Sequence, residues 1–285
     1  MTEVREVTAA RSGTLLGDTA ARDYADKLSR FNDYAEPELR GLIKSLDLRP
    51  GMHVLDAGCG TGEALNWLLS EVAPSERVVG VDLAAAHASA ARLHVPPDIQ
   101  IHQANLFDAA FEPASFDFVW CVNTINHLTD PVKGVIHLST LLRQGGRVAL
   151  GQSSFLPDMY FAWDARLERV TNDAVRRYYR DRYRIDERDL RAVRALVGIL
   201  RAADLRNVTV CTVMIERTWP LDEPTESYLR ETIFRDTWGE RLRPYLSADD
   251  YQELARLCNP QHADYALRRR DFHFLQTFTL ATGEI

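Results

Sequence analysis

Two kinds of pattern alternate between residues 37 and 150. Short β-branched runs are separated by longer stretches in which apolar residues recur at helical spacing. This alternation is typical of a parallel sheet with helices on its faces, because parallel strands need a crossover connection. We therefore expect an α/β fold with a Rossmann-like, doubly wound sheet. Seven strands are predicted in the whole chain, at residues 53–57, 77–83, 99–105, 116–122, 147–152, 207–215 and 272–281.

Two of the predicted helices have boundaries that the sequence marks. Pro37 is expected in the first turn of one helix, whose apolar residues recur until Pro50 and Gly51 end it. Asp130 and Pro131 are expected as the N-cap and the first residue of another helix. The pattern between 130 and 150 therefore predicts a helix followed by a strand.

Residues 153–186 and 220–271 interrupt the alternation and are richer in aromatic residues and arginine. We expect these two segments to be mainly helical insertions. Their rings either pack the insertions onto the sheet or form a lid over a flat or apolar substrate. The other expected parts are an N-terminal helical cap at 1–50, a ligand-binding core at 51–152, and the rest of the α/β core at 187–219 and 272–285.

Three glycines follow the first strand in the sequence VLDAGCGTGE, residues 54–63. Gly58, Gly60 and Gly62 allow the backbone to approach a ligand, and the following helix offers unpaired N–H groups at its N-terminus. A dinucleotide-binding turn has the pattern GxGxxG, but Glu63 occupies the position of its third glycine. The additional carboxylate disfavours a diphosphate ligand.

The second strand ends at Asp82, which lies 24 residues beyond Gly58. A carboxylate about 20 residues after the first glycine is typical of ribose binding. The other interpretation of Asp82 is an N-cap for the next helix. With the glycine turn in strand–turn–helix–strand order, Asp82 favours a ligand that contains a ribose.

The sequences VLDAGCGTGE and VVGVDLA, residues 78–84, resemble the first two motifs of class I S-adenosylmethionine-dependent methyltransferases. The resemblance extends through NTINHL, residues 123–128, to LRQGGRV, residues 142–148, and covers roughly residues 37–150. In that family the sheet has seven strands and the last is antiparallel, which implies a closing pair at 207–215 and 272–281. The resemblance also implies S-adenosylmethionine as the cofactor of the core at 51–152.

The same resemblance assigns the methionine end of the cofactor to the glycine turn. The backbone of Gly58, Gly60 and Gly62, together with Cys59 between them, would line the methionine moiety. Asp56 would hold the ammonium group, directly or through water.

The nucleoside end is assigned to residues that follow the next strands. Asp82 would accept hydrogen bonds from the ribose hydroxyls, and Leu83 would pack on the adenine face. Many family members have an aspartate where this chain has Asn105, whose amide oxygen can still accept from the adenine amino group while the Leu106 N–H donates to the ring. Asn123 would lie beside the transferable methyl group.

Methyl transfer from a sulfonium is an in-line displacement, so it mainly requires a positioned nucleophile and the exclusion of water. A base is needed only when the acceptor must lose a proton. His127, after the fourth strand, is the candidate base or substrate contact; its other interpretation is a residue that fixes its own loop. Tyr24 resembles the aromatic residue of an N-terminal lid helix in many relatives, or simply packs there.

Composition and residue spacing argue against several other classes of function. The formal net charge of -7 disfavours nucleic acid and anionic membrane surfaces as partners, and no apolar run approaches the ~20 residues of a membrane span. The four cysteines form no CxxC pair, which argues against zinc knuckles and disulfides and favours the cytoplasm. The histidines form no HxxxH or HxH group and no acidic cluster follows the fourth strand, so we expect no metal.

The residues after the fourth strand narrow the acceptor. Residues 123–126, Asn-Thr-Ile-Asn, lack the Pro-Pro-aromatic pattern of base-amine methyltransferases and the paired glutamates of protein arginine methyltransferases. The expected function is methylation of a small molecule at oxygen, nitrogen or carbon. A non-catalytic protein that binds S-adenosylmethionine and an NAD(P)-dependent oxidoreductase remain alternatives, and the sequence indicates no oligomeric state.

Overall fold

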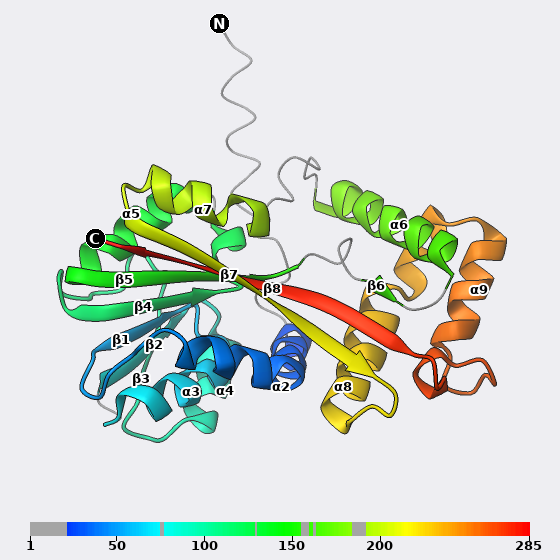
Figure 1. Ribbon diagram of the computed structural model, residues 1–285, viewed down its shortest axis with the longest axis horizontal. Helices are drawn as coiled ribbons and strands as arrows, with labels where there is room; N and C mark the ends of the chain where they lie inside the picture. Colours follow the sequence, from blue (N-terminus) through cyan, green and yellow to red (C-terminus); the bar gives the residue numbers. More distant parts are fainter. Residues whose placement is uncertain (1–21, 75–76, 129, 155–159, 162–163, 184–191) are drawn as a thin grey trace, which may run out of the picture.

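The predicted alternation of strands and helices is present in the computed structural model, which describes residues 22–74, 77–128, 130–154, 160–161, 164–183 and 192–285 (Figure 1). All seven predicted strands are confirmed. An eighth strand of two residues, β6 (Tyr160–Phe161), was not predicted. The seven are β1 (Val54–Ala57), β2 (Val78–Asp82), β3 (Gln100–Gln103), β4 (Phe116–Val122), β5 (Leu142–Ser153), β7 (Arg206–Thr218) and β8 (His273–Glu284).

These strands form one mixed sheet. The order is β3-β2-β1-β4-β5-β8, and β7 pairs with the other edge of β8. Strands β1 to β5 are parallel, whereas β8 is antiparallel to both β5 and β7. The short β6 pairs with the first part of β8. The expected antiparallel last strand is therefore confirmed, and it lies between β5 and β7.

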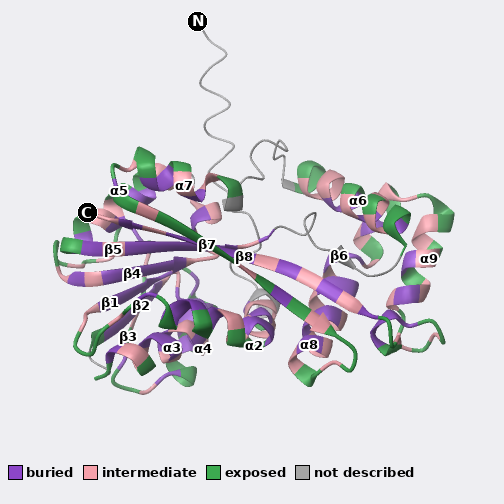
Figure 2. Ribbon diagram, viewed as in Figure 1, coloured by how far each residue is buried: buried purple, intermediate pink, exposed green. Residues whose placement is uncertain are grey.

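Helices pack on both faces of this sheet. On one face Leu65 and Leu68 of α3 (Glu63–Val72) belong to an apolar cluster with α2. On the other, Val135 of α5 (Pro131–Leu141) and Leu196 of α7 (Ala192–Ala202) belong to a second cluster (Figure 2). Asp130 caps α5 as predicted, because its Oδ1 accepts from the Lys133 N–H at 3.0 Å. The remaining core helix, α4 (Ala85–His94), connects β2 to β3.

The prediction that a helix begins at Pro37 is wrong. Helix α2 spans Arg22–Lys44 and contains Pro37 in its interior. Proline in a helix removes one hydrogen bond, but the buried stripe of α2 continues across it from Phe31 and Tyr34 to Leu39 and Leu42. Burial of this stripe against the core offsets the lost bond, so the helix does not end.

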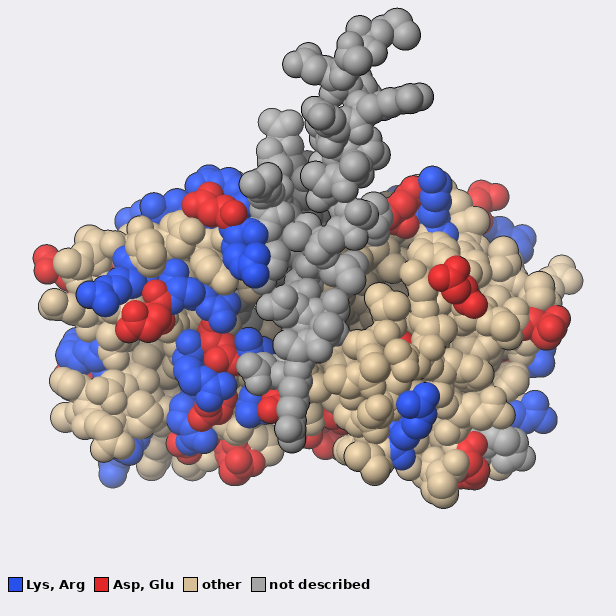
Figure 3. Space-filling model, turned by 180° about the vertical axis from the view of Figure 1, so that it is seen from behind, with Lys and Arg blue, Asp and Glu red and all other residues tan. Residues whose placement is uncertain are grey.

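The two aromatic-rich segments contribute a helical lobe, defined as residues 164–183 and 223–268, which lies around the outer half of the β7–β8 pair (Figure 1). Arginine side chains gather over it (Figure 3), and α6 alone contains six arginines. Among the described residues, no helix is both long and apolar enough to span a bilayer. The elements are α6 (Ala165–Tyr183), α8 (Glu223–Ser227), η4 (Tyr228–Thr237), η5 (Glu240–Tyr245), α9 (Ala248–Cys258) and η6 (Ala266–Arg268).

The aromatic residues of the lobe mainly pack its interior. Tyr228, Phe234 and Trp238 are each 3% exposed. Phe234 and Trp238 stack with their centroids 5.6 Å apart, and Tyr228 stacks on Tyr34 of α2 at 4.4 Å. Of the two interpretations of these rings, packing therefore describes these three.

Candidate functional site

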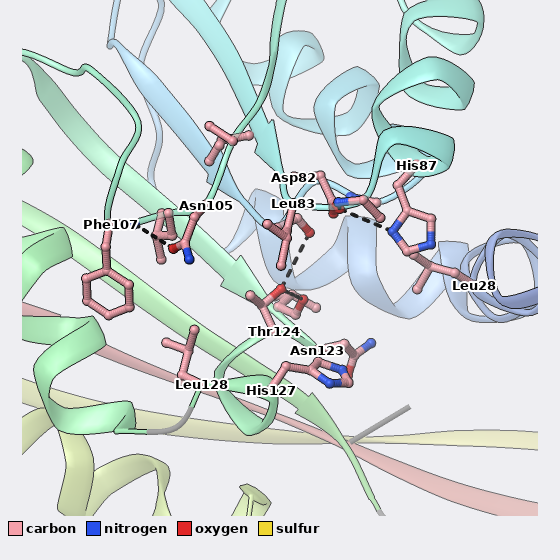
Figure 4. Close-up of a pocket in the computed structure, with 17 residues that line it drawn as sticks. Leu28, Asp82, Leu83, His87, Asn105, Phe107, Asn123, Thr124, His127 and Leu128 are labelled. Atoms are coloured by element: carbon pink, nitrogen blue, oxygen red, sulfur yellow. Dashed lines mark hydrogen bonds and ion pairs between the residues drawn. The ribbon is translucent and has the colours of Figure 1, made fainter. Parts of the chain in front are cut away.

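A pocket lies where β1, β2 and β4 end at the carboxyl edge of the sheet (Figure 4). This is the edge at which open α/β sheets bind ligands. The cavity has a volume of about 210 Å³ and is open to solvent. Its lining is Leu28, Gly58, Gly60, Val81–Ala84, His87, Ala104–Phe107, Val122–Thr124, His127 and Leu128.

The glycine turn forms one wall of the pocket. Gly58 has φ +88°, and a Cβ there would lie 2.1 Å from Oγ1 of Thr124. Gly60 has φ +53°, and a Cβ there would lie 2.3 Å from Cδ2 of Leu28, which comes from α2. Both positions require glycine, because a side chain would meet a neighbour as well as an unfavourable backbone conformation. Gly62 faces away from the pocket and packs on Ala91 of α4.

Two of the other predicted cofactor residues lie behind this wall, outside the lining of the pocket. Cys59 is buried, and its N–H donates to the carbonyl oxygen of Val81 at 3.0 Å. Asp56 is 2% exposed, and its Oδ2 has no hydrogen-bond partner. Burial raises the pKa of Asp56 well above its usual value, and the charges of Asp82 and Glu63 raise it further. A cationic group at this end of the pocket would offset that cost.

Glu63, which replaces the third glycine of a dinucleotide turn, is a buried structural link. Its Oε2 accepts from Oγ1 of Thr61 at 2.6 Å and from Nδ2 of Asn32 at 2.9 Å. Asn32 belongs to α2, so the carboxylate connects the glycine turn to the helix that covers it. The Glu63 carboxylate beside the glycine turn therefore disfavours a diphosphate ligand at this position.

Asp82 joins the glycine turn to the start of α4. Its Oδ2 accepts from the Gly60 N–H at 2.9 Å, and its Oδ1 accepts from the Ala84 N–H at 2.9 Å. Nδ1 of His87 also lies 3.2 Å from Oδ1. The N-cap of α4 is Ala84, so the interpretation of Asp82 as the N-cap is wrong. The carboxylate faces the pocket, where the ribose interpretation requires it.

The residues predicted to surround the adenine, Leu83, Asn105 and Leu106, all line the pocket. Figure 4 shows Leu83 beside Asp82. Leu83 is 51% exposed, which is unusual for a large apolar side chain beside a pocket. Oδ1 of Asn105 accepts from the Phe107 N–H at 3.0 Å, and Nε2 of His137 lies 3.0 Å from the carbonyl oxygen of Leu106. This loop is therefore held by one internal hydrogen bond and by a contact with His137 of α5.

Asn123 connects the carboxyl ends of β4 and β5. Its backbone is left-handed, with φ +52°. Its Oδ1 accepts from Nε2 of Gln152 and from the Ser153 N–H, both at 3.0 Å. Asn123 lines the pocket, but its side-chain oxygen is already engaged with β5, so a ligand would meet the other side of this amide.

His127 ends a short helix, η2 (Ile125–His127), and lines the pocket. Burial lowers its pKa to about 4; the charge of Asp82 opposes this shift and His87 adds to it. The imidazole is therefore neutral at physiological pH. Tyr24 lies in the first turn of α2, and its side chain is outside the described part of the structure.

The charges around the pocket favour a cation. Among the described residues that line it, Asp82 is the one carboxylate and there is no lysine or arginine. Glu63 is buried behind the glycine turn, and its charge and that of Asp82 add to the effect of burial in raising the pKa of Asp56. Within the described part of the chain, no three His, Cys, Asp or Glu side chains are arranged to hold a metal ion.

Several residues of the pocket were not predicted. Leu28 comes from α2, which is remote in sequence from the turn it covers, and no periodicity indicates that contact. The sequence could have indicated His87, because it lies five residues after Asp82 at the start of a helix. The others each lie next to a predicted residue in the sequence and are Val81, Ala84, Ala104, Phe107, Val122, Thr124 and Leu128.

An open sheet of this order, with a glycine turn after β1 and a carboxylate at the end of β2 facing one pocket, defines the class I S-adenosylmethionine-dependent methyltransferase fold. Comparison with known families agrees. Residues 55–150 match the family described as "Methyltransferase domain", so the chain contains a domain of this family.

Individual relatives cover less than the whole chain. The ubiquinone biosynthesis O-methyltransferase of Paracidovorax citrulli is 36% identical over 135 residues, 45% of this chain and 56% of that protein. The 27-O-demethylrifamycin SV methyltransferase of Amycolatopsis mediterranei is 29% identical over 149 residues, 50% of this chain and 54% of that protein. The chain thus spans little more than half the length of these curated relatives.

A solved structure extends the likeness of fold beyond the matched domain. The YcgJ protein of Bacillus subtilis superposes with a TM-score of 0.52 at 17% identity, covering 86% of this chain and 97% of that one. At this identity the likeness concerns the fold alone.

Proposed function

We propose that this protein transfers a methyl group from S-adenosylmethionine to a small molecule. The observation that carries the proposal is the charge of the pocket, which has one carboxylate and neither lysine nor arginine in its described lining. A sulfonium cofactor with an ammonium group suits such a site, whereas the diphosphate of NAD(P) would be repelled. The methyltransferase match at residues 55–150 supports the same cofactor.

In this proposal the cofactor lies along the carboxyl edge of the sheet. Its methionine end lies against Gly58 and Gly60, with Asp56 behind them, and its ribose faces Asp82. Leu83, Asn105 and Leu106 surround the adenine. The methyl group then points toward Asn123 and His127, where the acceptor enters. Cys59 and Gly62 support the turn from behind.

The hydrogen bonds of Asp82 make this arrangement testable. A carboxylate has about four acceptor sites, and Gly60, Ala84 and His87 already occupy three of them. Two ribose hydroxyls can be accepted only if one of these bonds is given up, and in the proposed arrangement it is Gly60 that lies against the cofactor. We expect the Gly60 amide resonance to shift strongly on titration with S-adenosylhomocysteine, whereas the Ala84 amide should shift less. Equal small shifts of both would contradict ribose binding by Asp82.

His127 has a limited role in this chemistry. An imidazole whose pKa lies near 4 is neutral and accepts hydrogen bonds, but it is a weak base for a hydroxyl acceptor. We infer that His127 orients the acceptor, and that positioning in line with the sulfonium supplies most of the rate.

The first experiment is calorimetric titration of the purified protein with S-adenosylmethionine, S-adenosylhomocysteine and NADH. Micromolar binding of the two sulfur compounds without binding of NADH is expected. Binding of NADH alone would overturn the proposal and favour the oxidoreductase alternative.

The second experiment tests turnover with radiolabelled methyl donor. Both curated relatives named above are methyltransferases, and one is named for an oxygen acceptor, so phenolic and other hydroxyl compounds come first in the screen, followed by amines and carbon acids. Donor binding without transfer to any of these classes would favour the non-catalytic alternative.

A further inference from the structure

Strand β7 leaves a long apolar edge of the sheet exposed. Among the described residues it pairs with β8 alone. It is 13 residues long, and its sequence from Val208 to Met214 contains no charge, proline or glycine. Val210 and Met214 are each 56% exposed (Figure 2). Natural edge strands are usually short or interrupted by charges, because a free edge pairs with other strands.

The direction of the free backbone groups follows from the pairing with β8. Thr218 is opposite His273 in the register, and the Trp219 N–H donates to the carbonyl oxygen of Phe272 at 3.3 Å. Hydrogen-bonded and non-hydrogen-bonded pairs alternate along an antiparallel ladder. Odd-numbered residues of β7 therefore bond to β8, whereas Val210 and Thr212 turn their N–H and C=O groups outward.

We propose that a second copy of this chain binds along this edge, with the two β7 strands antiparallel and related by a two-fold axis at Cys211. Val210 then lies opposite the partner's Thr212, and these residues exchange both of their outward hydrogen bonds. The two sheets become one continuous sheet. Cys211, which is exposed and forms no disulfide, lies opposite the partner's Cys211 in a non-hydrogen-bonded pair.

The charges at the ends of β7 favour its own copy as the occupant. Arg206 begins the strand and Glu216 lies near its end, and each is five positions from Cys211, which is the midpoint between them. Antiparallel pairing centred on Cys211 brings Arg206 to the same end as the partner's Glu216, and the same contact recurs at the other end by symmetry. Thr209 is then opposite the partner's Val213, so no like charges face each other.

Light scattering after gel filtration tests the assembly. The wild-type chain should have twice the 32.3 kDa mass of one copy. Val210→Lys places two ammonium groups diagonally across the two-fold axis, and it should weaken the dimer at least tenfold. Ile136→Lys is the matched control, because Ile136 is an exposed apolar residue on α5 at 46% exposure. The control should remain a dimer.

Oxidative cross-linking tests the register. Under mild oxidation the wild-type chain should form a covalent dimer on a non-reducing gel, and Cys211→Ser should not. In the Cys211→Ser background, Thr209→Cys alone should also fail, because its two copies lie about 13 Å apart along the strands. Thr209→Cys combined with Val213→Cys in that background should restore the cross-link.

The outcomes separate clearly. A mass of one copy at every concentration tested would overturn the proposal, and so would a dimer that Val210→Lys and Ile136→Lys weaken equally. A dimer in which Thr209→Cys alone cross-links as fast as Cys211 would overturn the two-fold axis at Cys211.

Discussion

The α/β core and the helical lobe differ in what their characteristic residues do. In the core, residues that face the pocket are held by backbone geometry: Gly58 and Gly60 adopt positive φ, and Asn123 is left-handed. In the lobe, aromatic residues are buried against one another, as with Phe234 and Trp238. None of the described lobe residues lines the pocket.

This difference separates two kinds of sequence signal. A glycine turn specifies a backbone shape that a ligand uses directly, so its motif indicates a site. A high density of aromatic residues indicates a need for packing, and it predicts the lobe's interior rather than a binding surface. The core should therefore respond to mutation in donor affinity, and the lobe in stability.

The largest expected effect is in the lobe. Trp238→Ala removes a buried ring that stacks on Phe234, and it should lower the free energy of unfolding by about 3–5 kcal/mol. Urea denaturation measures this. Trp238→Phe keeps the stacking and should lose clearly less. Donor affinity of the folded Trp238→Ala protein should stay within about twofold; a large loss would break the distinction between the two regions.

Gly58→Ala is the corresponding test in the core. The new Cβ would lie 2.1 Å from Oγ1 of Thr124 at φ +88°, so strain and overpacking together should cost roughly 2–4 kcal/mol. Donor binding should also be lost, because the wall of the pocket moves. Gly41→Ala is the control: nothing lies within 4 Å of its added Cβ in α2, and it should stabilise the helix by up to about 1 kcal/mol.

Asp82→Ala should weaken donor binding by about 1.5–3 kcal/mol, which is the range for hydrogen bonds to a charged group. Calorimetric titration with S-adenosylhomocysteine measures this loss. Asp108→Ala removes an exposed carboxylate outside the pocket and should leave the affinity unchanged. Unchanged affinity in a folded Asp82→Ala protein would mean that the ribose does not meet this residue.

The smallest effect concerns pH. The pKa of His127 falls from 6.5 to about 4 on folding because burial disfavours the charged ring, so the unfolded chain binds more protons in this window. The stability contributed by neutral His127 is complete above about pH 6.5 and is lost as the pH falls toward 4. His127→Asn should therefore lose less stability than wild type between pH 7.5 and pH 5 in urea titrations. Parallel losses in both proteins would refute this pKa.

The sequence predicted the sheet and the local part of the site. The glycine turn and Asp82 were predictable because each lies in a continuous segment that encodes its own backbone shape. Leu28 was not, because its contact with Gly60 depends on how α2 crosses the sheet edge. The start of α2 was missed for a related reason: burial of Tyr34 and Leu39 outweighs the local preference of Pro37.

Helix α2 contacts both regions. Leu28 covers the glycine turn, Asn32 bonds to Glu63, and Tyr34 stacks on Tyr228 of the lobe. Lys27 of the same helix pairs with Asp236 of the lobe at 3.3 Å. A displacement of the lobe that carried α2 with it would move Leu28 relative to the glycine turn, so this one helix links the packing of the lobe to the shape of the pocket.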